Sequence, residues 1–199
     1  MQFSTFFLAA LSLGSAIASP VVGFVPFTEA HKAVSQAKIV VEQQLIQIKL
    51  LTTGTPDIKT VAKVQSSLLI IGQSVNSLVL PAVALSSYGP IPLSKDQYAT
   101  LSVFQEDFLN IIVDLELIGK RITGSNLDKN AISKVKPQLQ WALSPVGAIS
   151  QSIVTFVDVA APKYATYKHW TPYLVNIQAL IVVGLAKIAL YLGINISIL

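Results

Sequence analysis

The first 18 residues, MQFSTFFLAALSLGSAIA, constrain the chain most, because they predict the compartment in which it folds. An apolar run from Phe6 to Leu13 is followed by small residues and by Ala16-Ile17-Ala18, the small-x-small pattern that a signal peptidase cuts. The run is too short to span a bilayer. It therefore predicts a removable signal peptide, residues 1–18, with cleavage between Ala18 and Ser19, and a mature protein that is secreted or displayed at the cell surface.

The composition is apolar and poor in charge. Apolar residues make up 52% of the chain and charged residues 12%, about half the usual share, and there is no cysteine. A secreted chain without disulfides depends on packing, or on a bound ligand, for its stability. The net charge of +4 comes from scattered basic residues without interleaved aromatic ones, so we expect no nucleic-acid partner.

The apolar positions follow a helical rhythm, with spacings that alternate between three and four residues. After an extended lead-in at 19–28, the rhythm predicts helices over about 29–51, 55–85, 94–123 and 128–161. The fourth segment keeps its rhythm past Pro137 and Pro145, which predicts one kinked helix or two stacked ones. With a very apolar terminal helix at 172–199, these segments predict an all-α fold, a single antiparallel bundle of about five helices over 29–199.

The terminal segment allows three interpretations, because a helix that is apolar nearly all round is either buried or in lipid. The favoured one is a central helix wrapped by the other four. A membrane span is weakened by Lys187 near its middle and by Lys163, Lys168 and His169 on its outer side. A lipid-anchor attachment signal is the weakest, because no polar spacer precedes the tail.

The sequence contains no complete catalytic or metal-binding motif. Two segments, Ser35-Gln36-Ala37-Lys38 and Ser133-Lys134-Val135-Lys136, match S-x-x-K, but the companion motifs of that catalytic family are missing. His31 and His169 belong to no recognisable constellation, and there is no G-x-S-x-G, H-E-x-x-H, Walker or His/Cys metal pattern. The acidic residues of the third segment fit a solvated face. We therefore expect a protein that is not an enzyme and that needs no metal or cofactor.

What remains is a capacity to bind apolar molecules. Rows of large side chains facing small ones can pack solidly, which is the favoured interpretation, or can leave a tunnel for an alkyl chain. The candidate lipid-lining residues are Leu68, Ile71, Phe104, Phe108, Ile111, Leu139, Ile149 and Ile153. A basic cluster near the loop between the third and fourth segments supplies the head-group candidates Lys120, Arg121 and Lys134, although such residues also serve simply as the charged ends of helices.

The segment from Ser86 to Pro162 carries a resemblance to a known family. It contains SSYGPIPLSKDQ before a long helix that ends in LELIGKRI, then LDKNAISKVKPQLQWAL and a final VDVAAPKY. In this layout the chain resembles the fungal hydrophobic-surface-binding protein A family, which includes cell-wall galactomannoproteins. The resemblance implies a helical bundle that adsorbs to hydrophobic surfaces or holds a long-chain fatty acid. The alternative is a membrane- or wall-associated structural protein that is anchored by its terminal helix.

Overall fold

The computed structural model describes residues 25–53, 57–87 and 95–160, together with 182–184, 186–187 and 189–190. The described chain is about 90% helical and contains no strand. Its long elements are α2 (Val25–Leu51), α3 (Ile58–Asn76), α4 (Val79–Ser86), α5 (Lys95–Thr123), α6 (Lys129–Leu143) and α7 (Val146–Ala160). The predicted all-α fold is thus confirmed for this part of the chain. The expected signal peptide, residues 19–24 of the expected lead-in and most of the terminal segment lie outside the described residues. The prediction of an extended lead-in is wrong for residues 25–28, which form the first turn of α2, where the missing N–H of Pro26 is tolerated.

Two of the four predicted segments are divided into two helices each. The second segment consists of α3 and α4, which meet around Ser77. The fourth segment consists of α6 and α7, which meet at Ser144. Pro81 does not end the second segment, because it lies within the first turn of α4, where its missing N–H is tolerated. Pro137 is accommodated inside α6, and Pro145 directly precedes α7.

Local signals explain where α3 and α6 begin. The Asp57 carboxylate accepts a hydrogen bond from the Thr60 amide at 2.6 Å, within a capping box, and the Asp128 carboxylate accepts one from the Ala131 amide at the same distance. The Asp57 hydrogen bonds also hold the pKa of that carboxyl below its usual value.

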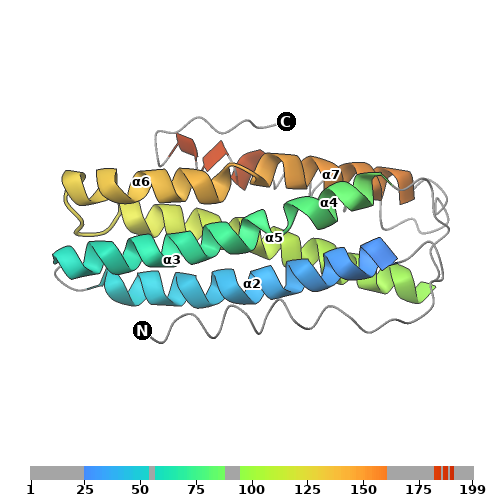
Figure 1. Ribbon diagram of the computed structural model, residues 1–199, viewed down its shortest axis with the longest axis horizontal. Helices are drawn as coiled ribbons and strands as arrows, with labels where there is room; N and C mark the ends of the chain where they lie inside the picture. Colours follow the sequence, from blue (N-terminus) through green and yellow to red (C-terminus); the bar gives the residue numbers. More distant parts are fainter. Residues whose placement is uncertain are drawn as a thin grey trace.

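The elements form a bundle in which consecutive segments reverse direction (Figure 1). The most extensive packing, however, joins helices that run the same way: α2 lies along α5, α3 along α6, and α4 along α7. Helix α2 also packs against α3 and α4. The bundle therefore consists of two helical hairpins laid against each other, and its core is built between them.

The core is continuous and almost entirely aliphatic, with a small aromatic cluster at one end. Phe27 of α2 contacts Phe104 of α5 edge-on at 5.5 Å and Phe156 of α7 at 5.7 Å between ring centroids. All three rings are buried. This cluster ties three helices together at the end of the bundle where α2 and α5 begin.

The terminal segment is described at only seven residues, of which Gly184 and Lys187 contact α5. Gly184 is buried so close to Ile112 that an added Cβ would lie 2.8 Å from the Ile112 Cγ2 atom. The Lys187 ammonium lies 3.5 Å from a Glu116 carboxylate oxygen. Lys187, expected to disfavour a membrane span, is thus paired with a charge on the bundle.

Candidate functional site

The candidate lipid-lining residues all lie in the core. Leu68, Ile71, Phe104, Phe108, Ile111, Leu139, Ile149 and Ile153 are each no more than 2% exposed. Their burial confirms the amphipathic pattern from which they were chosen. It does not distinguish a ligand site from a packed interior, and that question depends on the space among them.

One small apolar hollow lies among the candidates. It is lined by Ala30, Val34, Leu78, Pro81, Ala82, Phe104, Ile149 and Ile153. The space among these atoms is nowhere wide enough to admit a water molecule. Ligand sites for drug-sized molecules usually enclose about 300–1,000 Å³. In this conformation, therefore, the hollow does not hold an alkyl chain.

The side chains of the three head-group candidates do not converge on one site that could bind a head group. Arg121 of α5 is turned toward the end of α2, where its Nε donates to the Thr52 hydroxyl at 3.1 Å and its Nη2 to the Thr53 hydroxyl at 2.9 Å. The Lys134 carbonyl accepts a hydrogen bond from the Gln65 side chain at 2.8 Å, which joins α6 to α3, while its side chain is exposed. Lys120 is exposed as well. Arg121 thus has a structural role in joining α2 to α5.

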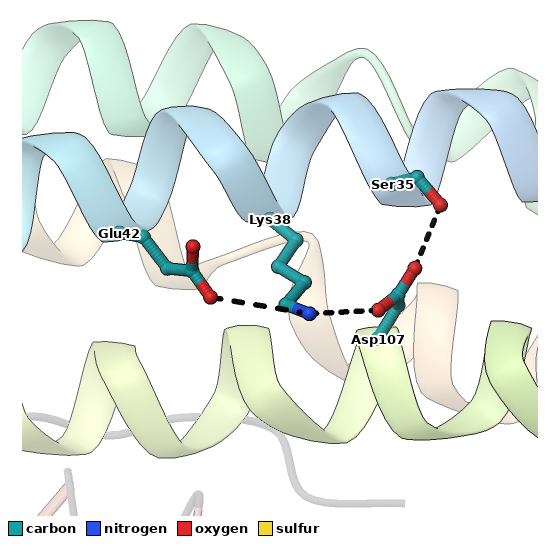
Figure 2. A network of polar contacts seen from close by, with 4 residues as sticks. All are labelled: Ser35, Lys38, Glu42 and Asp107. Atoms are coloured by element: carbon teal, nitrogen blue, oxygen red, sulfur yellow. Dashed lines mark hydrogen bonds and ion pairs between the residues drawn. The ribbon is translucent and has the colours of Figure 1, made fainter.

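A polar cluster that the sequence analysis missed lies between α2 and α5 (Figure 2). Asp107 accepts a hydrogen bond from the Ser35 hydroxyl at 2.7 Å and one from the Lys38 ammonium at 2.9 Å. Glu42 approaches the same ammonium at 4.0 Å. Asp107 had been assigned to a solvated face, but only 8% of this residue is exposed. The position of Asp107 in the apolar rhythm of the third segment gives no sign that α2 covers this side chain.

The electrostatics of the cluster match its geometry. Burial disfavours the charged form of Asp107, but the hydrogen bonds from Ser35 and Lys38 and the nearby positive charge outweigh it, so the pKa of Asp107 is lowered. The hydrogen bond to Asp107 raises the pKa of Lys38. Asp114, one heptad further along α5, shows the opposite: burial raises its pKa, and the Glu42 carboxylate adds to the effect.

Two side-chain polar atoms among the described residues are buried without a hydrogen-bond partner. They are His31 Nε2 and Gln105 Oε1. The His31 ring stacks on Phe27 at 6.2 Å and meets Phe104 edge-on at 6.3 Å, so this imidazole belongs to the edge of the aromatic cluster. The sequence analysis had given His31 no special role, and its position beside the core was not foreseen.

No group of three or more His, Cys, Asp or Glu residues that could hold a metal is present among the described residues. The Ser35, Lys38 and Asp107 arrangement places a hydroxyl next to a carboxylate, but Asp107 also neutralises Lys38, and an aspartate in this state is a poor base. The geometry accounts for this cluster as a polar link between two helices.

Comparisons with known proteins identify no relative. No family model matches the chain, no curated protein matches it, and no solved structure matches it.

Proposed function

We propose that this is a secreted, non-enzymatic protein that binds apolar surfaces or long-chain lipid. The supporting observation is the amount of apolar side chain that remains outside the core. Large aliphatic residues are exposed on α2, α3, α4 and α5, and Ile58, Leu80 and Leu50 are 88%, 81% and 67% exposed. Burying such surface contributes about 25 cal/mol per Å².

On α2 the exposed aliphatic residues follow one helical face. Ile39, Ile46 and Leu50 are separated by seven and four residues, and all three are more than half exposed. On α4 the exposed Leu80 and Val83 are three residues apart, which also places them on one face, and Leu69 and Ile70 are exposed on α3. Outward apolar stripes of this kind fit adsorption to a surface.

The packed hollow favours the outer surface over the interior as the place of binding. A ligand in the interior would require the helices to separate. The candidate lining residues would then exchange their contacts with one another for contacts with the lipid. The proposal therefore takes apolar adsorption as the principal mode. Lipid uptake into the bundle between the Phe104 and Ile149 rows is the second mode.

The alternative function is a structural protein of a membrane or wall, anchored by its terminal helix. The segment from Ile58 to Ser86 is long and apolar enough to cross a membrane by length and composition, with a mean hydropathy of 1.9 over its most apolar window. Its inner face, including Val64, Leu68 and Ile71, packs into the core. The segment thus packs one side into the core and leaves Leu69 and Leu80 exposed, and the anchor in this alternative is residues 172–199.

The proposed function is tested by adsorption of the purified secreted protein to polystyrene beads and to neutral phosphatidylcholine vesicles. The variant Ile46→Gln/Leu50→Gln removes two outward apolar residues of α2 without touching the core. We expect its adsorption to fall at least several-fold with unchanged circular dichroism. Equal adsorption of this variant and the native protein would contradict a role for the α2 face.

A matched control comes from the polar positions of the same helix. Gln43→Ala and Gln47→Ala change two exposed residues of α2 but remove no apolar surface. Their adsorption should equal that of the native protein. Extraction and mass spectrometry of the purified protein test the second mode, since a near-stoichiometric fatty acid would show that the interior opens.

A further inference from the structure

No further inference is drawn: the strongest candidate, the outward apolar face of α2 formed by Ile39, Ile46 and Leu50, has nothing in the structure to show what covers it beyond the surface binding already proposed.

Discussion

Replacing Asp107 by Ala is expected to destabilise the bundle by about 1.5–3 kcal/mol, because the partly buried Ser35 hydroxyl and Lys38 ammonium lose their charged acceptor. Asp107 accepts hydrogen bonds from both Ser35 and Lys38 and is the only one of the three in α5. Its loss therefore removes both hydrogen bonds that join Ser35 and Lys38 of α2 to α5. Chemical denaturation followed by circular dichroism measures the change in the free energy of unfolding.

The control separates the charge from the contact. Asp107→Asn keeps the size of the side chain and one acceptor oxygen, so we expect a smaller loss than for Asp107→Ala. Glu42→Gln removes a half-exposed carboxylate that only approaches Lys38 at 4.0 Å, and it should change stability by less than about 1 kcal/mol. An Asp107→Ala variant as stable as Glu42→Gln would show that the link contributes nothing.

The same carboxyl predicts a pH dependence. Since the pKa of Asp107 is lower in the folded protein than in the unfolded chain, the unfolded state binds the proton more readily. The contribution of Asp107 is fully present above its unfolded pKa, near 4, and is lost as the pH falls through the lower folded value. Asp114, whose pKa is raised, works in the opposite direction over the acidic range. Measuring the free energy of unfolding of the native protein and of Asp107→Asn between pH 7 and pH 3 isolates the contribution of Asp107. If the two free energies differ by the same amount at every pH, the predicted pH dependence is contradicted.

The sequence predicted the positions of the helices better than it predicted which helices pack against each other. The three-four rhythm of Leu101, Phe104, Phe108 and Ile111 is local, so it placed α5 and its inner face correctly. Pairing is not local. Nothing in the rhythm specified that α2 would lie along α5 instead of packing only against α3, and the burial of Asp107 follows from that pairing.

The division of the second and fourth segments has a similar cause. A continuous apolar stripe is compatible with a straight helix, a kink or a break, because the core side of each is the same. The breaks near Ser77 and Ser144 lie beside each other in the bundle, since α3 packs on α6 and α4 on α7. The position of each break is therefore matched to the neighbouring helix pair, which is a property of the packed bundle and not of either sequence segment.

The Trp141–Gly72 contact is the second place where a large effect is expected. The Trp141 ring of α6 lies directly over Gly72 of α3, and a Cβ added to Gly72 would overlap two carbons of the ring. Gly72→Ala gains helix propensity of up to about 1 kcal/mol but must displace the indole. Because overpacking typically costs about 1–3 kcal/mol, we expect Gly72→Ala to be destabilising overall.

A double-mutant comparison tests this packing directly. Trp141 is 41% exposed, so Trp141→Ala alone removes part of the contact between α3 and α6 while leaving space above Gly72. In the Trp141→Ala background the Gly72→Ala change should turn from destabilising to stabilising, because only the gain in helix propensity remains. Urea denaturation of the four proteins measures the coupling. If Gly72→Ala has the same effect with and without the indole, the two helices do not approach each other through this pair. The packing of α3 on α6 would then rest on its aliphatic residues and on the Gln65–Lys134 hydrogen bond.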